Sequence, residues 1–283
     1  MALAFFNTVP VVVLGGGDLA SGVIYRLHRA GFPVFVTELP APLFVRRTVC
    51  FGEAVYSGDI TIEGVTARLA DNTDTARQIV NAGDVAVLID ARGQLFPVLS
   101  PVVLVDVRME KENLGITRDD APLVIALGPG FTAGDDVHAV IETNRGHDLG
   151  RVIWQGAAEP DTGQPGNMAG KTHSRVLRSP ADGHVHPHAQ IGDHIKAGDT
   201  IADVNGEPIV AQFDGVLRGL IHERVRVWKN LKIGDLDPRD NPKAVRTISD
   251  KSLAVGGGVL EAVMSSDVVR AAMRKAHETA PRL

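Results

Sequence analysis

Short apolar runs rich in Val, Ile and Leu alternate with helical patches over about the first 155 residues of the chain. Such alternation is typical of a parallel sheet covered by helices. It predicts an α/β protein with a Rossmann-like, mostly parallel sheet in residues 1–170. The strands of this sheet are expected at Val11–Leu14, Val34–Glu38, Val85–Asp90, Val102–Val107 and Leu123–Leu127.

Helical periodicity marks two segments between these strands. The first follows a glycine-rich turn, ends at Gly31, and carries an apolar stripe made of Leu19, Val23, Ile24 and Leu27. The second is predicted from Thr73 to Asn81. Beyond them, "HAVIET" and "GRVIWQG" predict an antiparallel hairpin that closes the sheet.

A pattern of much shorter strands follows the linker-like stretch "AAEPDTGQPGNMAG". Shifting Pro180–Asp203 by 32 positions places Asp182 and Gly183 on Asp214 and Gly215. Each half is too small to bury a core, so we expect the two halves to interleave. Residues 171–240 thus resemble an all-β barrel-sandwich domain of the biotinyl/lipoyl type. Their central hairpin, residues 204–208, lacks the lysine that such domains modify, so a swinging-arm carrier is not expected.

The segment 241–283 is predicted to be helical and to pack back on the first domain. Ser249 or Asp250 is its candidate N-cap, and an apolar stripe follows. Three consecutive glycines, Gly256–Gly258, interrupt this stripe. Because three glycines inside a helix cost about 3 kcal/mol relative to alanine, either a close backbone approach or a break in the helix is expected there.

Composition narrows the classes of function. The 283 residues carry a net charge of -5 and no basic block, which argues against binding to nucleic acid. No apolar stretch reaches the roughly 20 residues needed to cross a membrane, and the N-terminal segment lacks the basic region of a signal peptide. One cysteine, Cys50, excludes an internal disulfide. We therefore expect a cytoplasmic protein that holds any anionic ligand locally.

The turn after the first strand carries the candidate chemistry. The spacing Gly15-x-Gly17-x-x-Ala20 opens a helix, and Glu38 ends the next strand. In dinucleotide-binding proteins this arrangement brings main-chain N–H groups to a pyrophosphate, and the acid binds a ribose hydroxyl. Asp18 opposes that interpretation, because a carboxylate about 5 Å from a phosphate charge costs roughly 3 kcal/mol at an effective dielectric constant near 20. The alternative is a turn that only allows close strand–helix packing.

Other candidate ligand-binding residues follow the ends of the predicted strands, where open α/β sheets bind ligands. Cationic side chains and main-chain N–H groups at that edge suit a phosphate-bearing ligand, although each is also a common surface or turn residue. With the glycine turn, the candidates are Gly15, Gly16, Gly17, Asp18, Ala20, Ser21, Glu38, Arg46, Arg47, Asp106, Lys111, Gly128, Gly130 and Phe131.

Metal and thiol chemistry have weaker signals. No acid or cysteine recurs at a matching spacing with His184, His186 and His188. We therefore interpret these histidines as part of a solvated surface strand and predict no metal site. Two interpretations of Cys50 stay open: a thiol activated by the nearby arginines, or a small buried apolar residue.

Six segments carry a resemblance that spans nearly the whole chain: "GGGDLASGVIYRLHRAGFPV", "RRTVCFGEAVYSG", "LGPGFTAGDDVHAVIETNRGHDLGRVIWQG", "DGVLRGLI", "GDLDPR" and "TISDKSLAVGGGVLEAV". In this order they resemble the YqeB-type proteins of the selenium-dependent molybdenum hydroxylase system, which are similar to xanthine dehydrogenase accessory proteins. The matching positions are Gly15–Gly22, Arg46, Arg47, Gly128–Gly134, Ser249, Asp250, Lys251 and Gly256–Gly258.

The resemblance implies a maturation factor that binds a molybdopterin-type cofactor or a nucleotide and docks on a molybdenum hydroxylase as its client enzyme. Cys50 stands where a serine is expected in much of that family, which argues against transfer of sulfur or selenium through it. Two alternatives remain: an NAD(P)-dependent oxidoreductase, suggested by the glycine spacing and Glu38, and a non-catalytic docking module. Catalysis, the catalytic residues and a homo-oligomeric state are left open.

Overall fold

The computed structural model describes residues 6–91, 93–161 and 173–279. Contacts divide the chain into two compact units. Unit 1 comprises Met1–Pro40, Phe51–Asp161 and Ile248–Leu283, and unit 2 comprises Ala41–Cys50 and Thr162–Thr247. The domain boundary expected between residues 170 and 171 lies outside the described residues, and the bounds predicted from the sequence stay a prediction.

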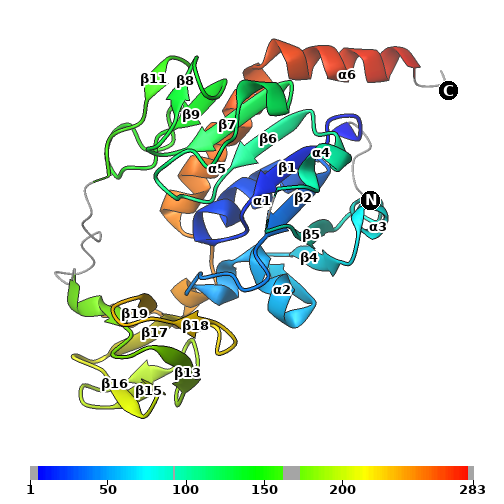
Figure 1. Ribbon diagram of the computed structural model, residues 1–283. Coiled ribbons are helices and arrows are strands. Elements are labelled where there is room, and N and C mark those ends of the chain that lie inside the picture. Colours follow the sequence, from blue (N-terminus) through cyan, green and yellow to red (C-terminus); the bar gives the residue numbers. More distant parts are fainter. Residues whose placement is uncertain (1–5, 92, 162–172, 280–283) are drawn as a thin grey trace. The chain divides into compact units, whose positions relative to one another are not determined.

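Unit 1 is built on one nine-stranded sheet of order β10-β9-β7-β6-β1-β2-β5-β4-β3 (Figure 1). Its strands are β1 (Val11–Leu14), β2 (Val34–Glu38), β3 (Asp59–Ile62), β4 (Val65–Ala70), β5 (Val85–Ile89), β6 (Val103–Asp106), β7 (Leu123–Leu127), β9 (Ala139–Ile141) and β10 (Val152–Ile153). The seven inner strands pair in parallel. The edge strands β3 and β10 are antiparallel to their neighbours.

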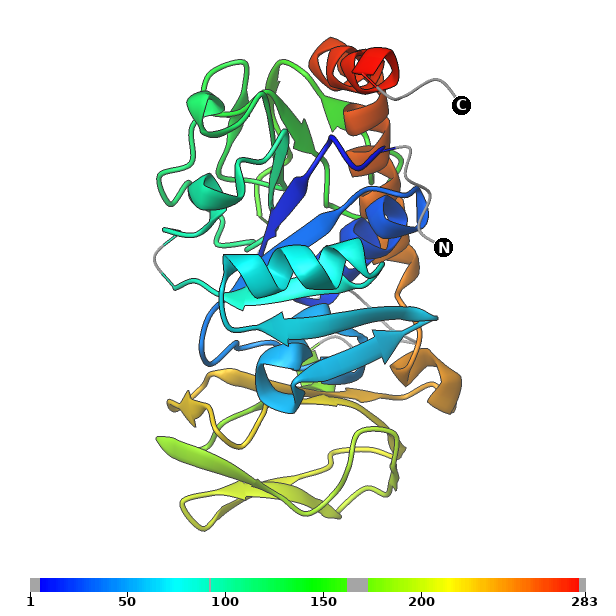
Figure 2. The ribbon, with the colours of Figure 1, turned by 90° about the vertical axis from the view of Figure 1, so that its right-hand side faces the viewer.

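Helices cover both faces of this sheet. One face carries α1 (Asp18–Arg29), α5 (Asp250–Ser265) and α6 (Asp267–Thr279), and the other carries α3 (Thr73–Asn81) and the single turn α4 (Phe96–Leu99). Figure 2 shows α3 lying across the sheet. Alternate residues of β1 enter the two cores: Val11 and Val13 pack on the α1 side, and Val12 on the α3 side. A short α2 (Ala54–Ser57) and a two-stranded sheet of β8 (Thr132–Ala133) and β11 (Gly156–Ala157) complete the unit.

Main chains touch where α1 crosses α5. A Cβ atom on Gly256 would lie 2.3 Å from the carbonyl oxygen of Gly22, and one on Gly258 would lie 2.1 Å from that of Gly150, whereas Gly257 has open space around it. Helix α5 runs unbroken through all three glycines. Of the two expectations for this segment, the close backbone approach is therefore confirmed.

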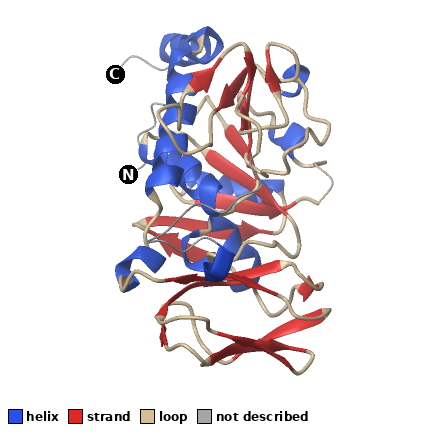
Figure 3. Cartoon of the chain, turned by 90° about the vertical axis from the view of Figure 1, so that its left-hand side faces the viewer, coloured by secondary structure: helices blue, strands red, loops and turns tan. Residues whose placement is uncertain are grey.

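Unit 2 consists mostly of strands and loops in its described part (Figure 3). Its two antiparallel four-stranded sheets have the orders β12-β19-β17-β14 and β16-β15-β13-β18. The strands are β12 (Val176–Arg178), β13 (Gly183–Pro187), β14 (His194–Ile195), β15 (Thr200–Val204), β16 (Glu207–Val210), β17 (Gly215–Leu220), β18 (Arg226–Val227) and β19 (Lys232–Asp237).

The strands β13, β14 and β15 begin 32 positions before β17, β18 and β19. The two halves exchange strands, because β18 of the second half pairs with β13, and β14 of the first half pairs with β17. Each sheet therefore contains strands from both halves, and neither half forms a sheet of its own.

The expected fold class, a Rossmann-like sheet followed by a barrel-sandwich domain, was wrong in two respects. The large sheet is mixed: the predicted hairpin of β9 and β10 closes one edge with an antiparallel strand, as expected, whereas the β3–β4 hairpin, which was not predicted, adds an antiparallel strand at the other edge. The two-residue turn of the β3–β4 hairpin places Glu63 at φ 47° and Gly64 at φ 81°. Glu-Gly is not one of the residue pairs that usually indicate such a turn in a sequence. The β-rich unit forms two antiparallel four-stranded sheets and includes Ala41–Cys50, which precede most of unit 1 in the sequence.

No single helix in the described ranges has the length and apolar character needed to span a bilayer; α5 together with α6 up to Arg274 meets both criteria only as a pair bent by 62°.

Candidate functional site

The turn between β1 and α1 presents main-chain groups at the carboxyl end of the sheet. Gly15 adopts φ +95°, which favours glycine, and its N–H donates to the carbonyl of Thr37 at 2.8 Å. A Cβ on Gly16 would lie 2.6 Å from the nitrogen of Gly52, whose N–H donates to the Gly16 carbonyl at 2.9 Å. Gly17 is the N-cap of α1, gives it no side-chain cap, and has no atom within 4 Å of its Cβ position. The first turn of α1 therefore begins next to open space.

Glu38 supports this turn from the end of β2. Its carboxylate accepts hydrogen bonds from the N–H groups of Gly16 and Leu39, each at 2.7 Å. Burial raises the pKa of the Glu38 carboxyl above its ordinary value, and these two hydrogen bonds lower it less than burial raises it. The acid that was expected to bind a ribose hydroxyl thus holds the glycine turn in place.

The pKa of Glu38 predicts how stability depends on pH. Because folding raises this pKa, the folded state holds the proton more tightly, so Glu38 lowers the free energy of unfolding as pH rises from about 4.5 through the folded pKa. Urea unfolding of the wild type and of Glu38→Gln between pH 4 and 7 measures this contribution. The stability of the wild type relative to the variant should fall across that window, and a rise would contradict the assignment.

Loops after β6, β7 and β9 gather at the same edge. Asp106 is buried and binds the guanidinium of Arg108, whose main chain lies 3.5 Å from the Cβ position of Gly15. Gly128 follows β7, and its Cβ position lies 2.6 Å from the hydroxyl oxygen of Thr143. These contacts place the glycine turn, Asp106 and Gly128 around one edge of the sheet.

The first turn of α5 adds charged groups to this edge. Ser249 is the N-cap, and its hydroxyl oxygen accepts from the N–H of Ser252 at 3.2 Å. Asp250 forms a two-fold hydrogen-bonded pair with Arg145 at 2.9 Å and 2.9 Å. Burial lowers the pKa of Lys251, Arg145 lowers it further, and Asp18 is the strongest of the acids that raise it.

Several predicted site residues serve other roles in unit 1. Ala20 and Phe131 are buried in the two apolar cores. Ser21 is fully buried and donates its hydroxyl to the carbonyl of Gly17 at 3.1 Å. Lys111 forms an exposed pair with Asp161 at 2.7 Å, and its main chain lies 2.5 Å from the Cβ position of Gly130.

The paired arginines belong to unit 2 and bind main-chain carbonyls there. Arg46 donates to the oxygens of Ala244 and Thr247, at 3.2 Å and 3.3 Å, and Arg47 donates to that of Leu220 at 2.9 Å. Their contacts anchor the 41–50 segment on unit 2. Cys50 is fully buried, as expected for a small apolar residue. Within the described ranges no group of three or more His, Cys, Asp or Glu side chains is placed to hold a metal ion.

Two charged residues at this edge were not predicted from the sequence: Glu142 and Arg145. Glu142 is buried after β9 and accepts three main-chain N–H groups, those of Thr143, Asn144 and Glu159, each at 2.7 Å. The sequence pattern predicted that the β9 segment pairs only with the β10 segment. The parallel pairing of β9 with β7, which brings Glu142 to the site, left no signal in the apolar pattern.

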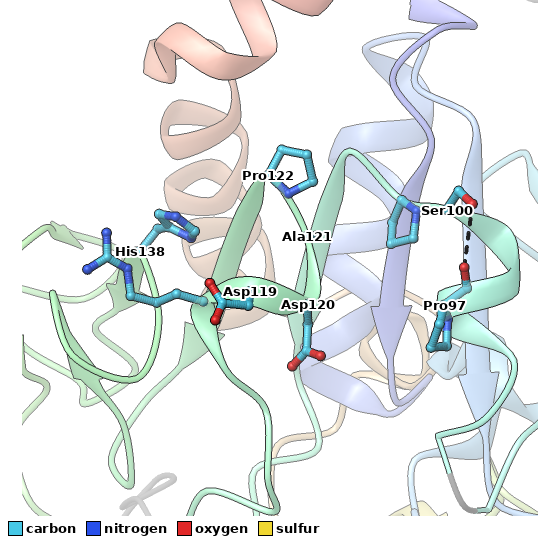
Figure 4. A pocket seen from close by; sticks show the side chains of 9 residues that line it. Pro97, Ser100, Asp119, Asp120, Ala121, Pro122 and His138 are labelled. Carbon is cyan, nitrogen blue, oxygen red and sulfur yellow. Dashed lines mark hydrogen bonds between the residues drawn. The ribbon is translucent and has the colours of Figure 1, made fainter.

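A separate hollow of about 540 Å³ lies at the amino ends of β6, β7 and β9 (Figure 4). Its lining includes three prolines, Arg118, Asp119, Asp120 and His138. His138 accepts the N–H of Val124 at Nδ1, and burial together with Arg118 lowers the pKa of its imidazole. The hollow shares no residue with the glycine-turn edge, and its charges are of mixed sign.

Comparisons with known proteins support the resemblance to YqeB. No protein-family model matches the chain. The uncharacterized protein YqeB of Escherichia coli K12 is 48% identical over 254 residues, which cover 90% of this chain and 47% of YqeB. The chain spans about half the length of this curated relative. It is therefore related to YqeB along most of its own length.

The solved structures that resemble this chain are too dissimilar to indicate its fold or function. An aspartoacylase family protein from Mesorhizobium loti has a TM-score of 0.25 and 14% identity, covering 81% of this chain and 84% of its own. A succinylglutamate desuccinylase/aspartoacylase from Rhodobacter sphaeroides gives the same TM-score and identity, covering 83% and 87%.

Proposed function

We propose that this chain binds a phosphate-bearing small molecule, a nucleotide or a molybdopterin-type cofactor, at the β1–α1 turn. We further propose that it acts as an accessory protein in the maturation of molybdenum hydroxylases, with a hydroxylase as its docking partner. The observation that carries the binding proposal is the start of α1 at Gly17, a helix of 12 residues without a side-chain cap and with open space beside its N-cap.

Several features of the edge support an anionic ligand. The N–H groups of a helix start carry partial positive charge and suit phosphate oxygens. Glu38 fixes the main chain of Gly16, so the turn is held in one conformation before any ligand arrives. Lys251 lies at the same edge. The molybdenum role rests on the motifs that resemble YqeB-type proteins.

Gly17→Val should remove ligand binding and lower the free energy of unfolding by no more than about 1 kcal/mol, because valine is a poorer N-cap than glycine. The backbone of Gly17, at φ -76° and ψ -167°, accepts a β-branched residue, and its Cβ would project into open space. The side chain would then stand where a phosphate must approach, and affinity for ADP or CDP, measured by calorimetry, should fall at least about tenfold. Gly257→Ala, in open space on α5, is the matched control and should bind as the wild type does.

Native mass spectrometry identifies the ligand class directly. Protein purified from a molybdenum-replete host should retain a phosphate-bearing mass that Gly17→Val lacks. Binding of NAD⁺ alone would favour the oxidoreductase alternative. Absence of every ligand, together with unchanged hydroxylase activity after deletion of the gene, would refute both the binding and the maturation proposals.

A further inference from the structure

Two turns of unit 2 have the same main-chain structure. The first turn, residues 196–199, joins β14 to β15, and the second turn, residues 228–231, joins β18 to β19. In each turn the fourth residue donates its N–H to the carbonyl of the first at 3.0 Å, and an aspartate outside the turn accepts the N–H of the second residue at 2.8 Å. The third residue is left-handed in both, with φ 92° at Gly198 and φ 71° at Asn230.

The side chains at the first two positions differ between these turns. The first turn carries Lys196 and Ala197, whereas the second carries Trp228 and Lys229. Because lysine and alanine allow the same main-chain path, the fold does not require an indole at the start of the second turn. Trp228 is 52% exposed, so much of its ring lies outside the core of unit 2.

Three cationic side chains come from the second turn and the strands beside it. Arg226, two positions before Trp228, is exposed, as is Lys229. The guanidinium of Arg178 donates to the carbonyl of the third residue of the turn at 2.8 Å. Among the residues that the structure describes, none forms an ion pair with Arg178, Arg226 or Lys229. One acid, Asp182, lies at the turn, and its Oδ1 accepts the main-chain N–H of Lys229. We call the three cations and Trp228 the tryptophan patch.

The first turn lacks this chemistry. Its fourth residue, Asp199, adds a carboxylate that accepts the main-chain N–H of Lys196 at 2.9 Å. The second turn has Leu231 in the corresponding place. The first turn is therefore an internal control, with the same main-chain path but an acid beside its lysine and no exposed aromatic ring.

The composition of the tryptophan patch indicates the kind of partner that it fits. Tryptophan and arginine are the residue types that contribute most at the centres of protein–protein interfaces. Three cations without an ion-pair partner are complementary to carboxylates. Single-stranded nucleic acid is bound by several aromatic side chains in succession, and the patch has one. We propose that the patch is a docking surface for an acidic segment of a partner protein, whose carboxylates bind the cations and whose apolar side chain packs on Trp228.

Selection from a library of random peptides tests the chemistry of the partner. The library is displayed on phage, selected on the whole chain, and counter-selected on the double variant Trp228→Lys, Lys229→Ala, whose second turn begins as the first turn does. The enriched peptides should carry several acids beside an aromatic or aliphatic residue. Enrichment of neutral or basic peptides, or no enrichment relative to the double variant, would overturn the proposal.

Calorimetry with the most enriched peptide separates the indole from the charges. Trp228→Lys adds a cation, so general attraction of anions would tighten binding, whereas loss of the apolar contact should weaken it at least about tenfold. Lys229→Ala should weaken binding by about threefold or more, and added salt should weaken it in the wild type. Lys196→Ala removes a cation from the first turn and is the matched control, which should bind as the wild type does. Equal losses at positions 196 and 229 would refute a site at the second turn.

Two other anionic probes complete the test. Oligothymidylate and vesicles containing phosphatidylserine should bind the wild type more weakly than the peptide does, and preferential binding of either would assign the patch to nucleic acid or to a membrane and reject the proposal. Each variant should unfold at the temperature of the wild type, which shows that a loss of binding is not a loss of folding. The β1–α1 turn has no part in this inference, so the failure of either proposal leaves the other standing.

Discussion

Gly256→Ala should destabilise unit 1 by about 3 kcal/mol or more in its free energy of unfolding. The added methyl group would lie 2.3 Å from the carbonyl oxygen of Gly22, and the atoms it meets are main chain of α1, which cannot rotate away. Relief requires α1 and α5 to separate, and this loosens the apolar core that both helices share with the sheet. Chemical denaturation followed by circular dichroism measures the loss.

The neighbouring glycines supply matched comparisons within one helix. Gly258→Ala should be as damaging, because its Cβ would lie 2.1 Å from the carbonyl of Gly150. Gly257→Ala has open space and should stabilise the helix by up to about 1 kcal/mol, through the higher helix propensity of alanine. Equal effects at positions 256 and 257 would contradict the contact between main chains.

Asp235→Asn should destabilise unit 2 by about 3 to 5 kcal/mol. Asp235 on β19 is 3% exposed, binds Arg175 at 2.5 Å, and lies 3.6 Å from Arg218. Removal of its charge leaves buried guanidinium groups without this counter-charge, which costs more than the pair itself contributes. The free energy of unfolding of the whole chain, measured with a probe of the β-rich unit such as Trp228 fluorescence, reports the change.

Asp148→Asn is the control for that experiment. The pair between Asp148 and Arg151 is exposed on both sides, with 57% and 68% of the side-chain surface accessible. Its loss should change stability by less than about 1 kcal/mol, because solvent screens surface pairs. Comparable losses of stability at positions 148 and 235 would show that burial does not determine how much the Asp235 pair contributes to stability.

Elements with a strong apolar pattern were predictable from the sequence. Strands β1, β2 and β7 have the predicted bounds because each is a buried apolar run, and helix α3 has them because of its helical periodicity and its clear ends. The β3–β4 hairpin was missed, since its Glu63-Gly64 turn and its half-exposed strands carry neither a usual turn pair nor a long apolar run. That hairpin and the β9–β10 edge make the sheet mixed.

The candidate site was predictable only in part. Local spacing identified the glycine turn and Glu38, but it assigned Glu38 to a ligand, whereas its oxygens bind the main chain of Gly16 and Leu39. The rest of the site depends on contacts between residues that lie more than 100 positions apart in the sequence: Ser252 binds the main chain of Asp18, and Arg145 binds Asp250. No local pattern reveals such pairs, because they depend on how α5 returns to the sheet.

The interleaved chain path of the two units has a consequence for synthesis on the ribosome. Unit 1 begins with β1 but needs α5, which ends at Ser265, and unit 2 needs both Ala41–Cys50 and β19. Neither can finish folding while the early part of the chain emerges alone, so the apolar strands of the large sheet stay uncovered on the α5 side for most of translation. Nascent chains halted before α5 should therefore bind chaperones and be cut by proteases far more readily than the finished protein.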